Sequence, residues 1–320
     1  MGLQDTRIEY YALFYVDSEA QSHVNLSKVH DPIDAYLQCA ATLALSLHAA
    51  KATLTVLTNS PDRLQQRLSS FGLAGVFKVV GLPFRRTVPT GIPFYSAHFK
   101  LDLFRYFAEN LSPLVCLLDI DTVMLKPINL PAEACNSLIA YDITEQHGAS
   151  YQAGTLSRDI GFLSTKPTKT SKWYGGEFLL GRPGHYALLA DKIDRLWPRY
   201  CEHLTRLHHV GDEMIVSAAL FELHSDGLAI MDAGRLKLVH RWWSARTECV
   251  QSSFSEAAEA SIIHLPSDKV FLASQAKHSF DRTKFLQTYR RYVRGKLLVR
   301  RLANPVLNVA TGARKFVGKI

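Results

Sequence analysis

Two carboxylates, Asp119 and Asp121, stand one residue apart directly after the apolar run Leu114–Leu118 (LVCLL). A fully apolar run of this length is typical of a central strand in a parallel sheet. Because side chains alternate along a strand, the two carboxylates face the same way. Paired carboxylates suit a hard divalent cation such as Mn²⁺ or Mg²⁺, which binds a diphosphate and neutralises its charge as it leaves. The spacing predicts such a metal site, although Asp-x-Asp also ends many strands without one.

The segments that must position these carboxylates alternate between strand and helix patterns. Strands are expected at Ile8–Val16, Thr53–Thr58, Val76–Val80 and Leu114–Leu118, and helices are expected to begin at Asp31, Ser60 and Ser96. This alternation predicts a mostly parallel α/β sheet covered by helices. Such a sheet binds ligands beyond the carboxyl ends of its strands, where Asp119 and Asp121 lie. After Pro131 the alternation weakens, with short strands and two helices, Pro183–Leu204 and Asp212–His224.

Other polar residues near the expected sheet edge are candidates for binding a nucleotide. Lys100 and Arg105 lie on the helix before the apolar strand, and we expect one of them to reach a diphosphate. An exposed lysine without a ligand is the alternative. Asp17 ends the first strand, where we expect it to meet the base or ribose. The pair His208-His209 has no third metal ligand at a recognisable spacing, so it is interpreted as a polar helix end.

The stretch Phe99–Pro127 (FKLDLFRYFAENLSPLVCLLDIDTVMLKP) resembles the DxD region of GT-A glycosyltransferases. In that pattern a helix precedes an apolar strand, the DxD follows, and an apolar segment then ends near a proline. The resemblance covers roughly residues 8–270 and is greatest to glycosyltransferase family 8, with echoes of family 6. Only the DxD stretch is specific. The resemblance implies a GT-A type, Rossmann-like fold and a nucleotide-sugar donor.

Two further segments resemble family 8. The stretch Trp173–Gly181 (WYGGEFLLG) is similar to the glycine-containing strand that lines the donor sugar, so Gly175 and Gly176 would let the backbone approach a ligand. A plain turn into a strand is the alternative. His264 stands where family 8 has a third metal ligand, and imidazole suits such an ion. The family has glycine three residues on and lysine six on, whereas this chain has serine and, five on, Lys269.

Asp212 and Glu213 open the second of the late helices. Carboxylates at a helix start are favoured by the helix dipole, so capping alone would explain them. Family 6 resembles this arrangement, with an Asp-Glu pair at a helix start beside the reacting sugar. The resemblance implies that Asp212 binds sugar hydroxyls of the acceptor or donor. It implies that Glu213 faces the anomeric carbon, where it stabilises positive charge or attacks.

Composition excludes several classes of protein. The chain has 320 residues, of which 47% are hydrophobic and 21% charged, as in ordinary globular domains. Its five cysteines are odd in number and include no CxxC pair, so we expect reduced thiols in a reducing compartment. Residues 1–20 lack a long apolar run, so no signal peptide is expected. No stretch of about 18 apolar residues is present to span a membrane.

The positive charge is confined to one end of the chain. Residues 281–320 hold eleven Lys or Arg and one acid, a net +10, whereas residues 1–280 hold 26 basic and 28 acidic residues, a net −2. Nucleic-acid binding by the main body therefore has no support. On a helix, an apolar stripe and a basic face would suit an anionic membrane surface, and a packed helix or a disordered tail are the alternatives. The stripe comprises Leu286, Tyr289, Val293 and Leu297, with Phe285 and Tyr292 alongside.

These features predict a GT-A domain, residues 1–278, followed by a basic, helical, membrane-associating tail, residues 279–320. We expect a cytoplasmic glycosyltransferase, peripheral on the inner face of the membrane, that moves a hexose from a nucleotide diphosphate donor. The donor is expected to be UDP-linked, and the acceptor a lipid-linked glycan or an oligosaccharide. The family resemblance implies retention of anomeric configuration, and family 8 enzymes that build lipopolysaccharide have similar basic, aromatic ends.

Two other functions, nucleotidyl transfer and a silent adaptor role, fit the sequence less well. A nucleotidyltransferase would need a glycine- and lysine-rich loop after the first strand, but the loop Asp17–Val29 contains no glycine. A catalytically silent GT-A-like membrane adaptor would have no reason to keep the like-charged pair Asp119 and Asp121, which is costly to hold together.

Overall fold

The computed structural model describes residues 7–17, 31–110, 112–147, 154–168, 171–245 and 249–296. Its main sheet has seven strands in the order β3-β2-β1-β4-β7-β6-β8. The strands are β1 (Ile8–Phe14), β2 (Leu54–Thr58), β3 (Lys78–Gly81), β4 (Leu114–Leu118), β6 (Leu138–Asp142), β7 (Tyr174–Gly181) and β8 (Ile230–Asp232). Only β7 runs antiparallel to its neighbours, β4 and β6. The Rossmann-like, mostly parallel α/β sheet expected from the sequence is confirmed.

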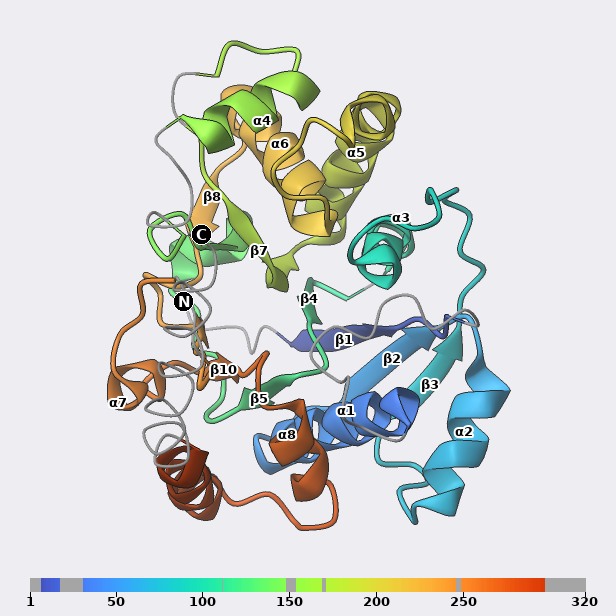
Figure 1. Cartoon of the computed structure of the whole chain (residues 1–320), viewed down its shortest axis with the longest axis vertical. Helices are drawn as coiled ribbons and strands as arrows, with labels where there is room; N and C mark the ends of the chain where they lie inside the picture. Colours follow the sequence, from blue (N-terminus) through green and yellow to red (C-terminus); the bar gives the residue numbers. More distant parts are fainter. Residues whose placement is uncertain are drawn as a thin grey trace, which may run out of the picture.

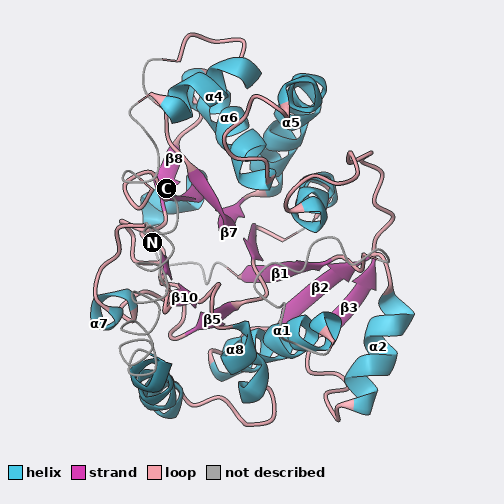
Figure 2. Ribbon diagram, in the orientation of Figure 1, coloured by secondary structure: helices cyan, strands magenta, loops and turns pink. Residues whose placement is uncertain are grey.

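Helices cover both faces of this sheet (Figures 1 and 2). They are α1 (Pro32–Ala49), α2 (Pro61–Ser70), α3 (Lys100–Ala108), α4 (Thr155–Leu163), α5 (Pro183–His203), α6 (Asp212–Ser225), α7 (Phe254–Ala257) and α8 (Lys269–Gln275), with 3-10 turns η1 (Tyr95–Phe99) and η2 (Ala132–Asn136). Strand β1 separates the two cores. Its Tyr10, Ala12 and Phe14 belong to the core with α1 and α2, and its Tyr11 and Leu13 to the core with α3, α5 and α6.

The start of α1 follows the signals in its sequence. The side chain of Asp31 accepts hydrogen bonds from the backbone N–H groups of Ile33 (2.9 Å) and Asp34 (3.3 Å). Pro32 occupies the first helical turn, where its missing N–H costs nothing. Strand β4 is buried along its whole length, as its apolar sequence predicts.

A second, three-stranded sheet carries late residues back to the DxD segment. It comprises β5 (Thr122–Met124), β10 (Ile262–His264) and β9 (Val239–Arg241), in the order β5-β10-β9. Strand β10 pairs antiparallel with β5, so that His264 lies opposite Thr122. It also pairs parallel with β9, so that His264 lies beside Arg241. This sheet therefore joins residues from three distant parts of the sequence at the end of β4.

The first part of the predicted tail packs on the domain. Residues 282–296 form a helix, and Phe285 (4% exposed) and Tyr289 (0%) are buried in a cluster with Trp242 and Phe271. The expectation that Phe285 and Tyr289 insert into a bilayer is therefore wrong, because both already cover the apolar surface around α8. Leu297 and all later residues lie outside the described part of the chain.

The membrane-facing role of the tail, and the boundary at residue 278, stay predictions. The outer face of the helix 282–296 exposes basic side chains, including Arg290, Arg291 and Arg294. Within the described residues, the structure contains no helix with the length and apolarity needed to cross a membrane.

Candidate active site

A cavity of about 490 Å³ opens at the carboxyl ends of β1 and β4. This is where a sheet of this type is expected to bind ligands. Seven of the nine residues predicted to form the site line the cavity: Asp17, Lys100, Asp119, Asp121, Asp212, Glu213 and His264. The other two, Gly175 and Gly176, are absent from the described lining. The structure thus gathers most of the predicted site residues into one space.

The three predicted metal ligands converge in this cavity. One ligand atom from each of Asp119, Asp121 and His264 lies within 4.8 Å of the others. His264 Nε2 is 3.1 Å from Asp121 Oδ1, and both side chains are almost fully buried. Two carboxylates and an imidazole form a donor set that suits Mn²⁺ or Mg²⁺, and their convergence fits one such ion.

Two lysines contact the carboxylates of this cluster. Lys100 Nζ lies 2.6 Å from Asp119 Oδ1 and 3.2 Å from Asp212 Oδ2. Lys269 Nζ lies 2.6 Å from Asp121 Oδ2. Burial would raise the pKa of Asp121, but Lys269 and His264 hold that pKa well below its ordinary value. Burial raises the pKa of Asp119 to about 6, against the attraction of Lys100.

The structure separates the two cations proposed for diphosphate binding. Lys100 reaches the DxD, whereas Arg105 is half exposed and pairs with Asp191 and Asp194 on α5. Both residues lie on the same helix, so their positions in the sequence do not distinguish between them. Lys269 stands five residues after His264, one fewer than in the family 8 pattern, and it reaches Asp121 because a short loop joins β10 and α8.

Glu213 is held by groups from other elements. Its carboxylate accepts hydrogen bonds from Arg241 Nη2 (2.7 Å), Trp173 Nε1 (3.1 Å) and the backbone N–H of Gly176 (3.2 Å). Burial would raise its pKa, but Arg241 lowers it overall, so the carboxylate is ionised at neutral pH. The N-cap residue of α6 is Gly211, which makes no side-chain capping bond. Glu213 lies in the first turn of α6, where the helix dipole favours a carboxylate, and it also binds these groups outside the helix.

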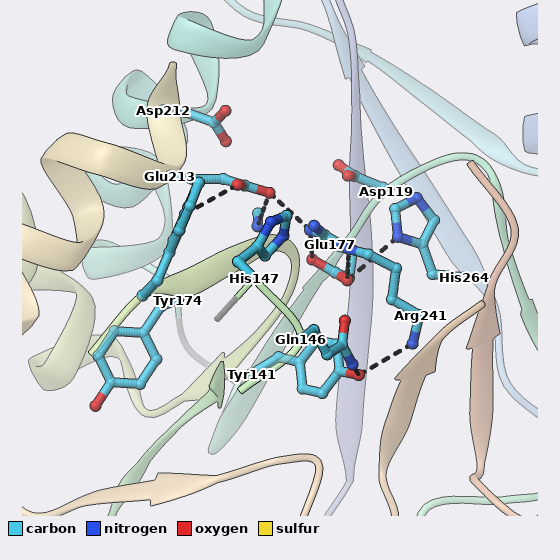
Figure 3. Close-up of polar contacts among 12 residues, drawn as sticks. Asp119, Tyr141, Gln146, His147, Tyr174, Glu177, Asp212, Glu213, Arg241 and His264 are labelled. Atoms are coloured by element: carbon cyan, nitrogen blue, oxygen red, sulfur yellow. Dashed lines mark hydrogen bonds and ion pairs between the residues drawn. The ribbon is translucent and has the colours of Figure 1, made fainter. Parts of the chain in front are cut away.

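A buried ion pair that the sequence analysis does not predict forms part of the cavity wall, where Arg241 lines the cavity and Glu177 lies behind it. Glu177 on β7 is fully buried, and its two carboxylate oxygens accept bonds of 2.6 Å from Arg241 Nε and Nη2. Figure 3 shows this pair between Glu213 and His264. The available signal was weak: a glutamate inside the otherwise apolar stretch GEFLLG, and an arginine inside LVHRWW.

The two predicted glycines make room for these charged side chains. A Cβ on Gly175 would collide with Glu177 and would come within 2.8 Å of Arg241 Nη2. A Cβ on Gly176 would come within 2.7 Å of Asp212 Oδ2 and 2.9 Å of Lys100 Nζ. Their observed role is thus close packing of protein groups, whereas the predicted contact with a ligand is not tested.

Aromatic rings line the side of the cavity near Glu213. The ring of His209 lies 5.1 Å from that of Trp173 and 5.4 Å from that of Phe94. His209 Nε2 is 3.9 Å from Glu213 Oε2. The interpretation of His208-His209 as a plain helix end missed this, because the turn before α6 directs His209 into the cavity. Asp17 follows β1 and also lines the cavity, whereas its predicted contact with a base or ribose is not tested.

Comparisons with known proteins add little to this geometry. No protein-family model matches the chain, and no curated protein matches it. Among solved structures, an active-site mutant of LgtC matches with 14% sequence identity and a TM-score of 0.45. The match covers 81% of this chain and 87% of that chain. Similarity at this level does not assign an activity, so the assignment depends on the side chains in the cavity.

Proposed function

We propose that this chain is a metal-dependent glycosyltransferase that moves a hexose from a nucleotide diphosphate sugar to a glycan acceptor. One observation carries the proposal: Asp119, Asp121 and His264 converge in a cavity that also contains Lys100 and Lys269. A cation site flanked by two lysines, at the carboxyl ends of parallel strands, suits a departing diphosphate. The resemblance of Phe99–Pro127 to GT-A enzymes supports a nucleotide-sugar donor, which we expect to be UDP-linked.

Two groups of residues around the cation site are proposed to bind the donor, one through the cation and one through its phosphate oxygens. Asp119, Asp121 and His264 would hold Mn²⁺ or Mg²⁺, which when bound neutralises charge on the diphosphate. Lys100 and Lys269 now pair with carboxylates of that cluster. When those carboxylates serve as metal ligands, the two ammonium groups are placed to pair with phosphate oxygens instead.

Glu213 is proposed to face the reacting sugar carbon. Three hydrogen bonds fix its carboxylate at the cavity wall, and Arg241 keeps it ionised. A carboxylate held this way stabilises positive charge on the anomeric carbon, whereas three donors weaken it as a nucleophile. Asp212, beside Lys100, would bind a sugar hydroxyl. Retention of configuration is proposed from the family resemblance alone.

The acceptor is proposed to be a lipid-linked glycan, with an oligosaccharide as the other option. The net charge of +10 over residues 281–320 supports a position on the anionic inner face of a membrane, in the cytoplasm. On the helix 282–296, Arg290 lies 5.9 Å from the centre of the Phe254 ring, whereas exposed Arg291 and Arg294 face away from the buried apolar stripe. They are therefore free to meet lipid headgroups without unpacking the helix.

A panel of nucleotide-sugars tests the proposal. Purified full-length protein with Mn²⁺ should release a nucleoside diphosphate from one donor, slowly with water and faster with a suitable acceptor. EDTA should abolish the release. Release of pyrophosphate from a nucleoside triphosphate and a sugar phosphate would instead identify a nucleotidyltransferase. Failure to bind Mn²⁺ and any donor would favour the silent adaptor.

A further inference from the structure

Glu177 and Arg241 form a buried ion pair that touches two parts of the candidate site. Glu177 has no exposed surface, and Arg241 is 6% exposed. Neither residue is among the three metal ligands, and neither is the carboxylate assigned to the sugar. Their contacts nevertheless reach His264 on one side and Glu213 on the other (Figure 3).

The first contact orients the metal ligand. His264 Nδ1 lies 3.2 Å from Glu177 Oε1, while Nε2 lies 3.1 Å from Asp121 Oδ1. With Nδ1–H donated to Glu177, the ring is fixed in the tautomer whose Nε2 lone pair faces the cation site. A carboxylate behind a histidine ligand is a recurrent device that fixes the ring and raises its basicity.

The second contact holds the carboxylate at the sugar. Arg241 Nη2 lies 2.6 Å from Glu177 Oε2 and 2.7 Å from Glu213 Oε1, so one nitrogen joins the two acids. Arg241 Nε binds the other oxygen of Glu177 at 2.6 Å. The backbone of Arg241 is held as well, because its N–H donates to Tyr141 Oη at 3.1 Å. A planar guanidinium anchored at these points leaves Glu213 little freedom.

We propose that Glu177 and Arg241 are positioning residues that set His264 and Glu213 from one shared ion pair. The inference rests on the proposed function for the role of Glu213, but the link to His264 concerns metal affinity alone. The cation site and the reacting carboxylate are then fixed relative to each other by two side chains. Displacing either side chain shifts groups that must align within a fraction of an ångström.

Mn²⁺ affinity tests the first half without any need for turnover. Glu177→Gln keeps the size of the side chain but removes its charge, and should weaken Mn²⁺ binding about 10- to 100-fold in an EPR titration. Glu222→Gln is the matched control, since Glu222 is also a buried carboxylate paired with a lysine, Lys192, remote from the cavity. It should lower the melting temperature and leave Mn²⁺ affinity unchanged.

A folded Glu177→Gln protein with the Mn²⁺ affinity of the unaltered chain would overturn the link to His264. If that variant does not fold, Glu177→Asp keeps the charge, shortens the side chain by one methylene and should show the same loss. This result is independent of the donor. A chain that binds Mn²⁺ as described but turns over no nucleotide-sugar would refute the proposed function and leave this half standing.

Arg241→Lys tests the second half. Lysine keeps the charge but cannot bind two acids as a planar fork. We expect kcat to fall about 100-fold, as for a misplaced catalytic group, with little change in donor KM. Mn²⁺ affinity should fall less than in Glu177→Gln. An unchanged kcat in a folded Arg241→Lys protein would overturn the positioning of Glu213 by Arg241.

Discussion

Asp121 is the carboxylate that contacts both the third proposed metal ligand and a lysine. It contacts His264 and Lys269, and its carboxyl is held ionised by them. Asp121→Asn should keep the shape and remove the charge that a cation needs. We expect donor turnover to fall at least ~100-fold, as when one preorganised stabilising group is lost. Mn²⁺ binding, measured by EPR on the same sample, should weaken in parallel.

One result would contradict the prediction for Asp121. Full activity of Asp121→Asn in EDTA would remove the metal assignment altogether. Lys269→Met removes one partner of Asp121 and leaves the other, His264, in place. It should weaken donor binding while all three proposed metal ligands remain. A loss of Mn²⁺ binding in both variants would instead point to a collapsed site, which circular dichroism would reveal.

A substitution of Glu213 distinguishes a catalytic role for this residue from a structural one. Glu213→Gln keeps one acceptor oxygen, which can serve Trp173 or the backbone N–H of Gly176 but not both, and it loses the charge that faces the cavity. We expect kcat to fall by at least ~10-fold, with Mn²⁺ and nucleotide affinity unchanged. If only the melting temperature falls while kcat holds, Glu213 is a structural residue. Both quantities should be measured on one preparation.

Sequence proximity decided which site residues could be predicted. Asp119 and Asp121 follow a buried strand, so alternation alone placed them at its end. Glu177 and Arg241 are 64 residues apart and meet only because the last residue of β9 lies against the middle of β7. No local periodicity in the sequence indicates that these two side chains are in contact. His264 and Glu213 were reached through family resemblance rather than through spacing.

The helix 282–296 belongs to the packing of the domain. Tyr289 donates to Asp268 Oδ2 at 2.6 Å, and Lys296 Nζ lies 2.7 Å from Asp268 Oδ1. Asp268 is 1% exposed and precedes α8, which begins with Lys269. The sequence predicts a domain over residues 1–278, from which a chain cut at residue 280 would be expected to fold alone. We expect the opposite for a chain cut there, because removing the helix would uncover Phe271 and leave Asp268 buried with fewer partners.

Two truncations test the role of this helix. A chain ending at residue 280 should be insoluble or melt well below the full chain, because a large apolar surface loses its cover. A chain ending at residue 296 keeps Phe285, Tyr289 and Lys296, and should melt close to the full chain. Thermal unfolding by circular dichroism compares them. Equal melting temperatures for both truncations would show that the helix adds no stability.

A buried histidine links η1 to α5. His98 is fully buried, with Nε2 2.7 Å from Tyr200 Oη and Nδ1 3.0 Å from the carbonyl of Phe94. Burial lowers its pKa from 6.5. The unfolded chain therefore takes up a proton first as pH falls below about 6.5. The stability from neutral His98 is complete above that pH and is lost toward the lower folded pKa.

Denaturant titrations at pH 7 and pH 5 measure this linkage. The unaltered chain should lose stability between the two values, and His98→Asn should lose less, although it is less stable at pH 7. His48, which is exposed at the end of α1, supplies the control: His48→Asn should keep the full pH dependence. Identical losses in His98→Asn and the unaltered chain would contradict the assignment.

Element prediction was most successful where the chain alternates. The expected strands at Thr53–Thr58 and Val76–Val80 appear as Leu54–Thr58 and Lys78–Gly81, with only their ends moved. The short β5 was not expected, because three residues carry no periodicity. It forms a strand by pairing with β10, which lies more than a hundred residues later in the sequence. The apolar stripe of the last helix was recognised, but its partner, the surface around α8, could not be inferred from the stripe.

At the scale of the molecule, charge is divided between a near-neutral body and a basic end. Full-length protein should bind vesicles that contain acidic lipid, with about 1 kcal/mol from each basic residue near the surface. Because Phe285 and Tyr289 are buried, binding through the helix 282–296 should be mainly electrostatic and should weaken steeply with salt. Co-sedimentation at low and high salt measures both effects.

The chain ending at residue 296 is the control for the vesicle experiment. It keeps six basic residues of the region and loses the five after position 296. It should bind acidic vesicles more weakly than the full chain, and neither protein should bind neutral vesicles. If full-length protein ignores acidic vesicles at low salt, the membrane proposal is wrong.

The distance along the chain between Asp121 and His264, 143 residues, also decides when the site can exist during synthesis. A ribosome that has delivered the DxD has supplied only part of the ligand set. Strand β10 must still emerge and enter between β5 and β9, and the helix that covers Asp268 follows later still. If the proposed site binds a cation, its complete ligand set would form only late in synthesis, and a stalled nascent chain would hold the acidic pair without the imidazole.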